Sequence, residues 1–374
     1  MQESFRLGKI WNIPIGFSQS WLLIFFFITY SLAVGYMPQA YPELNTPAYW
    51  ILGSVTSVLF FGSVLFHELA HAWVALRYGI PVRRITLWLF GGVAVMDKEP
   101  PSAKAEFWIA IAGPISSLIA AAGFYGLYLL ADSLAWLAAP AEYLFRINLI
   151  LAIFNMIPGF PLDGGRVLRA VVWHFTDYRR GTSAAAQTGQ VVAMMLVGIG
   201  LFQMVTSSFL DGLWLAFIGW FLHTSAKAHN AQATVQHVLD NATVERVMRT
   251  DWQEINSNTP VSLLIDEQIM RGGPRYYFVR GHGHDDAANP HGMLTMTDIA
   301  GLRRNLWRIT PVERLMTAWH RLVTIEPHVP LAEALREMDS RRINQLPVVR
   351  DEALVGVLTR ENVAQYIRLQ ARFA

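Results

Sequence analysis

The residues best suited to chemistry are two histidines and a glutamate in the pentapeptide HELAH, at positions 67–71. On a helix, His67 and His71 lie four residues apart on one face, so both imidazoles can reach one zinc ion. Glu68 lies beside them, where its carboxylate can take a proton from water. The same short pattern also arises by chance as a polar cluster at a helix end. Its position inside an apolar run favours a functional site, because ionisable side chains are costly in a bilayer.

A third ligand is expected in a second polar interruption, NMIPGFPLDGGR at 155–166. Pro158 and Pro161 break a helix there, and the two glycines permit unusual dihedrals. Irregular backbone at membrane depth is tolerated where protein or a water-filled cavity surrounds it. Asp163 on such a segment is a natural zinc ligand. The alternative is a loop aspartate that pairs with Arg166.

The composition divides the chain into an apolar part and a polar part. Of the 374 residues, 53% are hydrophobic and 16% are charged. Residues 1–229 contain 13 Lys and Arg and 11 Asp and Glu, whereas residues 230–374 contain 17 of each sign. The first part is therefore predicted to be embedded in a membrane and the second to be a soluble domain. The lack of cysteine excludes a disulfide scaffold, an iron–sulfur cluster and a cysteine nucleophile. The balanced charge does not indicate a nucleic-acid partner.

Uncharged runs predict about six transmembrane helices, since a crossing needs about 20 mostly apolar residues. The runs are Ile10–Pro42, Leu44–Phe66, Phe107–Ala131, Ile147–Leu162, Gly181–Leu210 and Gly212–Ala226. Lys and Arg lie in alternate loops, apart from Arg146 at the predicted outer end of the fourth run. The loops without them are Met37–Thr46, Asp132–Phe145 and Thr206–Asp211. Because Lys and Arg accumulate in cytoplasmic loops, both termini and the soluble domain are predicted to be cytoplasmic.

At this point the sequence resembles the site-2 protease family of intramembrane zinc metalloproteases, which pairs HExxH on one transmembrane helix with NxxPxxxLDG on a later one. Both motifs are complete here, as HELAH at 67–71 and NMIPGFPLDG at 155–164. The resemblance implies that His67, His71 and Asp163 hold one zinc ion per chain. It further implies that Glu68 is the general base and that Asn155 contacts the substrate or the reacting carbonyl.

Two further segments are similar to the same family. The stretch GGVAVM, which begins with Gly91 and Gly92, resembles a family segment that pairs with an unfolded stretch of substrate. The alternative for this stretch is a plain cytoplasmic hairpin. The tripeptide AGP at 112–114 also resembles the family, although physics alone predicts a kink and a close helix contact there.

The tail contains an internal repeat. VERVM at 244–248 recurs as VERLM at 312–316, and GMLTMTD at 292–298 recurs as GVLTREN at 356–362. The repeat resembles a tandem pair of cystathionine-β-synthase (CBS) domains. We therefore expect a transmembrane metalloprotease domain at 1–229, a linker at 230–242, and CBS repeats at 243–305 and 306–374.

CBS pairs often bind adenine nucleotide, with a hydroxyl towards phosphate and a carboxylate towards ribose. The resemblance places these groups at Thr295, Asp298 and Thr359, whereas the second copy has Asn362 in place of the carboxylate. The alternative is a pair that dimerises and binds nothing. His282, His284 and His291 suggest a second metal site, but a solvated loop is the favoured interpretation.

The predicted protein is thus a polytopic α-helical membrane protein with a cytoplasmic α/β CBS pair. Its expected function is intramembrane zinc-dependent hydrolysis of a membrane-protein substrate, with regulation by adenine nucleotide and a homodimer through the CBS domains. The alternative is a CBS-gated transporter or channel that uses the His and Asp site for an ion. HExxH argues against it, because transport needs no base beside the ligands.

Overall fold

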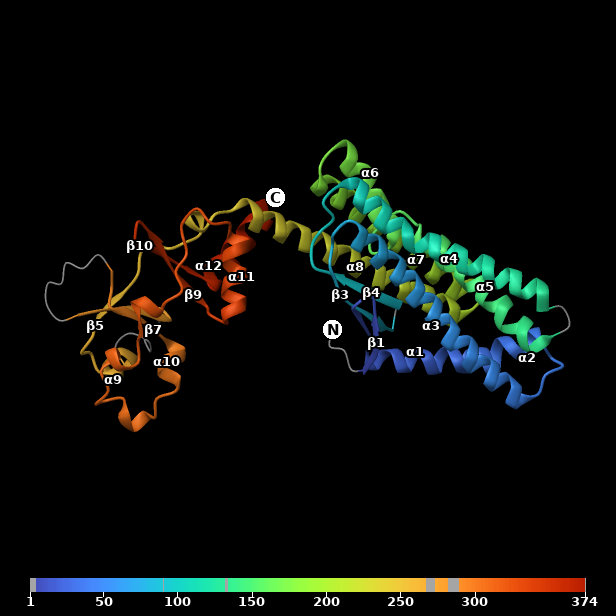
Figure 1. Ribbon diagram of the computed structural model, residues 1–374, viewed down its shortest axis with the longest axis horizontal. Coiled ribbons are helices and arrows are strands. Elements are labelled where there is room, and N and C mark those ends of the chain that lie inside the picture. The colour runs from blue at the N-terminus through green and yellow to red at the C-terminus, as the bar shows by residue number, and fades with distance from the viewer. Residues whose placement is uncertain (1–4, 90, 132–133, 267–272, 282–288, 374) are drawn as a thin grey trace. The chain divides into compact units, whose positions relative to one another are not determined.

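The structure is a computed structural model, and it describes residues 5–89, 91–131, 134–266, 273–281 and 289–373. The chain forms two compact units, Met1–Ala231 and Gln232–Ala374. The first unit is built mainly of long helices and the second mixes short strands with helices (Figure 1).

The long helices of the first unit are rich in apolar residues. They are α1 (Gln19–Tyr30), which continues through a π-helical turn (Ser31–Tyr36) into α2 (Met37–Ala40), then α3 (Thr46–Arg77), α4 (Ala103–Ala131), α5 (Ala135–Asn155), α6 (Asp163–Phe175), α7 (Tyr178–Thr206) and α8 (Phe209–Asn241). Among the described residues, five helical stretches are long and apolar enough to cross a membrane: Gln19–Ala40, Thr46–Arg77, Ala103–Ala131, Ala135–Asn155 and Tyr178–Thr206.

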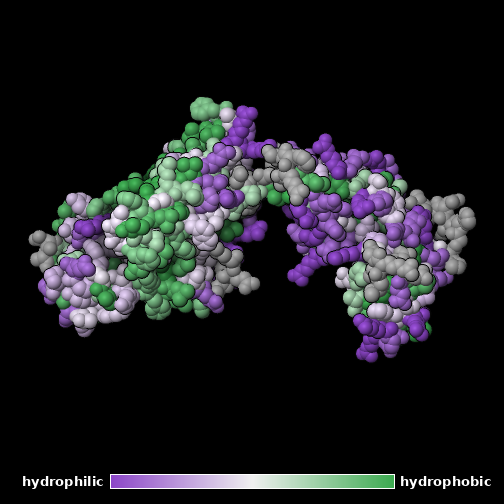
Figure 2. All heavy atoms as spheres, turned by 180° about the vertical axis from the view of Figure 1, so that it is seen from behind, coloured by the Kyte–Doolittle hydropathy of each residue, from purple (hydrophilic) through white to green (hydrophobic). Residues whose placement is uncertain are grey.

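The outer surface of these helices is apolar. Leu130, Phe202 and Val205 are 83%, 69% and 87% exposed, and hydrophobic residues spread over the visible face of this unit (Figure 2). Large side chains so exposed indicate a lipid-facing surface. The first unit is therefore that of a multi-pass membrane protein.

The fourth predicted span begins earlier than the sequence suggested. Most of the predicted outer loop Asp132–Phe145 belongs to α5, which ends at Asn155 rather than at Leu162. The charge of Arg146 does not end the helix, because its guanidinium pairs with Glu142 one turn earlier at 2.5 Å. Glu142 also accepts a hydrogen bond of 2.8 Å from the Tyr41 hydroxyl. Pairing within the protein allows both charges to lie on a long apolar helix.

The predicted sixth span, Gly212–Ala226, lies within α8, which is not one of the five candidates. Polar residues follow this apolar stretch from Lys227 onward. The predicted linker 230–242 is also largely helical, because α8 continues to Asn241.

A four-stranded sheet accompanies the helices of the first unit. Its strands are β1 (Phe5–Ile10), β2 (Ile13–Phe17), β3 (Val82–Trp88) and β4 (Gly91–Met96), in the order β1-β2-β3-β4. Strands β2 and β3 are parallel, and the other pairs are antiparallel. Ile13 and Ile85 pack with Ala72 and Ala75 of α3 in one buried cluster. The sheet thus lies against the C-terminal half of the helix that carries HELAH, with β4 at the edge of the sheet.

The second unit contains the two repeats. The first has β5 (Glu254–Asn256), α9 (Val261–Leu264), β6 (Tyr276–Arg280), β7 (Gly292–Thr295) and α10 (Met296–Ala300). The second has β8 (Thr317–Ala318), α11 (Leu331–Arg341), β9 (Gln345–Arg350), β10 (Ala353–Thr359) and α12 (Arg360–Phe373). Strands β5-β6-β7-β8 form one sheet and β10-β9 another.

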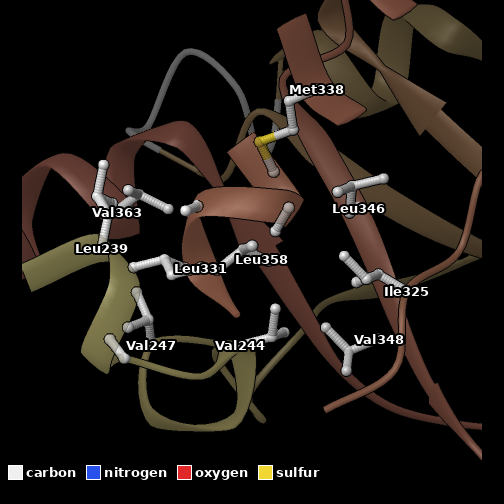
Figure 3. Close-up of a cluster of buried hydrophobic side chains, with 13 residues drawn as sticks. Leu239, Val244, Val247, Ile325, Leu331, Met338, Leu346, Val348, Leu358 and Val363 are labelled. Atoms are coloured by element: carbon white, nitrogen blue, oxygen red, sulfur yellow. The ribbon is translucent and has the colours of Figure 1, made fainter. Parts of the chain in front are cut away.

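Each repeat has a buried apolar core. The core of the second repeat includes Leu331, Leu346 and Leu358, and Leu239 from the end of α8 packs into it (Figure 3). That contact gives the end of α8 a tertiary role and explains why the helix continues where the sequence suggested a linker.

Candidate metal centre

Three ligand groups predicted from separate motifs meet in the first unit. Helix α3 presents His67 and His71 from one face, and α6 begins with Asp163. Asp163 Oδ2 lies 3.0 Å from His67 Nε2 and 3.2 Å from His71 Nε2, and the two Nε2 atoms are 3.1 Å apart. Among the described residues, these three form the group able to hold a metal ion.

The spacing of these atoms fits zinc. A tetrahedral zinc ion with bonds of about 2.0–2.1 Å keeps its ligand atoms about 3.3 Å apart, close to the distances between His67, His71 and Asp163. Two imidazoles and one carboxylate leave a fourth position for water or substrate, which is the composition of a catalytic zinc site. The donor set therefore fits the metal that the sequence predicted.

The break between α5 and α6 places Asp163 beside the two histidines. The chain leaves α5 at Asn155 and turns before α6 begins. Two glycines in the first turn of α6 make that turn compact. A Cβ on Gly164 would overlap the carbonyl oxygen of Ile157, and one on Gly165 would overlap the backbone at Gly159. Larger residues would push the start of α6 away from the histidines.

Helix α4 holds both imidazoles from behind. His71 Nδ1 donates to the Ile109 carbonyl oxygen at 2.6 Å. His67 Nδ1 is hydrogen-bonded to Ser117 Oγ at 2.8 Å. A histidine ligand that is bonded through one ring nitrogen keeps its ring orientation and leaves the other nitrogen for the metal. Ile109 and Ser117 therefore orient the two ligands.

Gly113 lies between these two contacts on α4. A Cβ added there would lie 2.5 Å from His67 Nε2 and would overlap His71 Nε2. The helix can thus approach the metal-binding atoms because this position has no side chain. Gly113 of the AGP tripeptide, for which physics alone predicted a close helix contact, is packed against His67 and His71.

A buried ion cluster fixes α6 against α4. Glu106 of α4 is fully buried, and its Oε1 accepts from Arg166 Nε at 3.0 Å and from Arg169 at 2.5 Å. Arg166 therefore pairs with Glu106, whereas Asp163 Oδ2 lies beside the two histidines. A buried carboxylate with two guanidinium partners is costly to disrupt, so the cluster anchors the helix that begins with Asp163.

The glycine-rich strand lies against Glu68. A Cβ on Gly92 of β4 would lie 2.9 Å from Glu68 Cδ and 3.0 Å from Oε1. Gly91 begins the strand with φ +126°, a backbone conformation that favours glycine. The two glycines therefore allow the sheet edge to cross the predicted base. Asn155 is half-buried at the end of α5, before the loop to Asp163.

Sequence reasoning missed Ile109, Ser117 and Glu106. All three lie on α4, and with Gly113 they follow the helical spacing of one face, 106, 109, 113 and 117. A buried glutamate and serine on an apolar helix were a signal that could have been used, because polar residues inside a membrane are functional by default. What they contact could not be read from their spacing alone.

Comparison of the sequence with known proteins shows which proteins this chain is similar to. The profile of Peptidase family M50 matches residues 55–133 and 131–198. A protein of Mycobacterium tuberculosis named "Putative zinc metalloprotease Rip3" is 34% identical over 383 residues, which cover 98% of this chain and 93% of that protein. The chain belongs to peptidase family M50. "Zinc metalloprotease MJ0392" of Methanocaldococcus jannaschii is 31% identical over 271 residues, 71% of this chain and 72% of that protein.

A solved structure is also similar to this M50 chain. "Site-2 Protease from Methanocaldococcus jannaschii" is 32% identical and covers 60% of this chain and 94% of its own, with a TM-score of 0.44. The CBS domain profile matches residues 312–369, which contain most of the second repeat. The family M50 match and the relatives named as zinc metalloproteases confirm the prediction of a zinc metalloprotease of the site-2 protease type. The CBS profile confirms the prediction of a C-terminal α/β CBS domain.

The residues predicted to bind nucleotide lie at corresponding strand–helix junctions of the two repeats. Thr295 Oγ1 donates to Asp298 Oδ2 at 2.7 Å, and the pair caps α10. In the second copy, Thr359 Oγ1 donates to Asn362 Oδ1 at 2.6 Å. Both pairs thus have a local capping role. His282 and His284 lie outside the described residues, and His291 precedes β7.

Proposed function

We propose that this M50 metalloprotease hydrolyses a peptide bond within or next to a transmembrane segment of a membrane-protein substrate. The observation that carries the proposal is the depth of the ligands. His67 lies ten residues before Arg77, the last residue of α3, which is about 15 Å at helical rise and about half of a hydrocarbon core. A peptide bond that reaches this centre must enter the membrane.

The chemistry follows from the ligand set and its neighbours. Zinc, when bound, supplies a Lewis acid that polarises water and the scissile carbonyl. Glu68 takes the proton of the attacking water and then delivers a proton to the leaving nitrogen. Asn155, at the end of α5, is placed by the proposal near the reacting carbonyl. Ile109 and Ser117 hold the imidazoles in the orientation that the reaction needs.

The substrate must be extended where it is cut. A helical backbone is hydrogen-bonded internally and closed to attack, so residues that break a helix should favour cleavage. Strand β4 is the edge of its sheet and can pair with an added strand through its backbone. Because Gly92 lies directly on Glu68, a segment paired with β4 would pass beside the base. We therefore include Gly91 and Gly92 in the proposed substrate-binding surface.

Zinc-dependent turnover by the purified chain tests this function. The full chain in detergent should cleave a single-span substrate that carries a helix-breaking pair of residues. A chelator should abolish cleavage, and added zinc should restore it. Cleavage that survives complete removal of metal would contradict the proposal.

The ligand role of Asp163 predicts the result of Asp163→Asn. We expect zinc affinity to fall by at least about 100-fold, because the loss of a direct ligand should cost more than the loss of a residue that only orients a ligand. Cleavage should fall with it. Competition with a chromogenic chelator measures the affinity. The matched control is Asp177→Asn: Asp177 accepts from the backbone NH of Arg180 at the start of α7, and asparagine caps a helix equally well. Unchanged zinc binding by Asp163→Asn would assign the third ligand elsewhere.

We also propose that the CBS pair lies in the cytoplasm and binds an adenine nucleotide that regulates cleavage. Thr295 and Asp298 in the first copy support the nucleotide site, because they offer a hydroxyl and a carboxylate at one junction. The orientation is supported by the Lys and Arg content of the alternate loops. Nucleotide can change activity only if it favours one arrangement of the protein over another.

The two copies provide their own control for nucleotide binding. Asn362 has the local geometry of Asp298 without the charge, so Asp298→Asn should keep the helix cap and lose the carboxylate. We expect ATP affinity of the full chain to fall by about 10-fold or more, the scale of a lost hydrogen bond to a charged group. Asn362→Asp should strengthen binding at the second copy. Calorimetric titration with ATP, ADP and AMP measures both effects, and no binding by the unaltered chain at millimolar nucleotide would overturn this proposal.

A further inference from the structure

The side chain of Phe160 connects the loop between α5 and α6 with helix α8. Phe160 lies between α5 and α6, three residues before Asp163, and is 3% exposed. Its ring stacks on the imidazole of His229 in α8, with ring centroids 5.0 Å apart and an interplanar angle of 20°. The Arg169 guanidinium lies 5.1 Å from the centroid of the same ring.

Helices α7 and α8 enclose Phe160. Its ring belongs to a buried cluster with Ala185 and Ala186 of α7 and Ala226 of α8. The Phe160 NH donates to the Ala185 carbonyl oxygen at 3.0 Å. The small residues at these positions bring the helices close to the loop, so a shift of α8 changes the space available to the ring.

The loop that contains Phe160 is packed tightly against the first turn of α6, which carries Asp163. A Cβ on Gly165 in the first turn of α6 would overlap the backbone NH of Phe160, so the loop and the helix that begins with Asp163 are packed together. Arg169 extends the same contact, because it touches the Phe160 ring and also donates to Glu106 of α4. Displacement of Phe160 therefore reaches both Asp163 and the helix that orients His67 and His71.

We infer that Phe160 and His229 are positioning residues for Asp163. The inference rests on the proposed role of Asp163 as a zinc ligand. The coupling from His229 to Asp163 runs through packed side chains of the first unit, with a defined contact at each step.

The first test removes the ring stack between Phe160 and His229 and then restores it. His229→Ala in the full chain should weaken zinc affinity by about 10-fold, the lower range for residues that support a metal ligand. His229→Phe should restore affinity, because a phenyl ring can stack in place of the imidazole. Lys227→Ala, an exposed position two residues earlier on α8, is the matched control. Zinc affinity of His229→Ala equal to that of the unaltered chain would overturn the inference.

A second variant separates the positioning role from the ligand assignment on which it rests. Full zinc binding by Asp163→Asn would reject the ligand assignment, whereas loss of zinc binding by Asp163→Asn with an unaltered affinity of His229→Ala would reject the positioning role alone.

Discussion

Replacement of Glu68 by glutamine should abolish cleavage while zinc stays bound. Glutamine has nearly the size of glutamate, so it fits under Gly92, but it cannot accept the proton of the attacking water. The loss of a general base typically costs about 10²- to 10⁴-fold in rate. Zinc affinity should stay at its original value, because the proposed ligands are His67, His71 and Asp163. Single-turnover cleavage and zinc content, measured on the same preparation, separate the two effects.

A matched control for this substitution is Glu43→Gln, which removes the same charge from an exposed residue between α2 and α3. It should cleave at the original rate. Substantial turnover by Glu68→Gln with a full complement of zinc would remove Glu68 from the base role. Loss of zinc together with activity would indicate that Glu68 supports the metal rather than the proton transfer.

Gly113→Ala should weaken zinc binding strongly, although alanine is the better helix former. A glycine inside a helix is normally less stable than alanine by roughly 0.5–1 kcal/mol, so the helix itself should gain from the change. The new Cβ would, however, lie 2.5 Å from His67 Nε2 and overlap His71 Nε2. We expect zinc affinity to fall by about 10- to 100-fold, the range known for residues that support metal ligands, with a matching loss of cleavage.

Helix α4 offers two control glycines for that experiment. A Cβ on Gly123 or Gly126 would meet nothing within 4 Å, so alanine at either position should leave zinc binding and cleavage intact. Chelator competition on the three variants gives a direct comparison. Zinc affinity of Gly113→Ala equal to that of the two controls would show that α4 does not approach the ligands as closely as the structure places it.

The three residues of the candidate metal centre were predictable because their signals are local. His67 and His71 share a helix face by their spacing, and Asp163 follows two prolines that end the preceding helix. The residues that orient these ligands were not predictable in the same way. Ser117 and the Ile109 carbonyl act through the packing of α4 on α3, a long-range contact that no local pattern specifies.

The boundaries of the membrane helices show the limits of charge counting. Arg146 appeared to mark the outer end of the fourth span, yet α5 runs through it, because Glu142 neutralises the charge within the protein. The strands before α1 were also missed, since uncharged residues from Ile10 onward were assigned to the first span. β2 exists because it pairs with β3 and buries Ile13 against α3, which is a tertiary effect.

The repeat in the tail was visible because both copies keep the same cap at the same junction. The Thr295–Asp298 and Thr359–Asn362 pairs have matching hydrogen bonds. The continuation of α8 was not visible in the same way. Its last turns are polar, and the contact that supports them, Leu239 in the core of the second repeat, comes from residues more than 80 positions further along the chain.

The most direct test of the central claim is to locate the cut. The purified chain and a single-span substrate are incubated in ¹⁸O-labelled water, and the masses of the products are measured by mass spectrometry. The account predicts zinc-dependent hydrolysis at a bond within or next to the apolar segment, with ¹⁸O in the new carboxylate and no product from Glu68→Gln. A zinc-dependent cut confined to a soluble region remote from that segment would contradict intramembrane proteolysis at the His67, His71 and Asp163 centre.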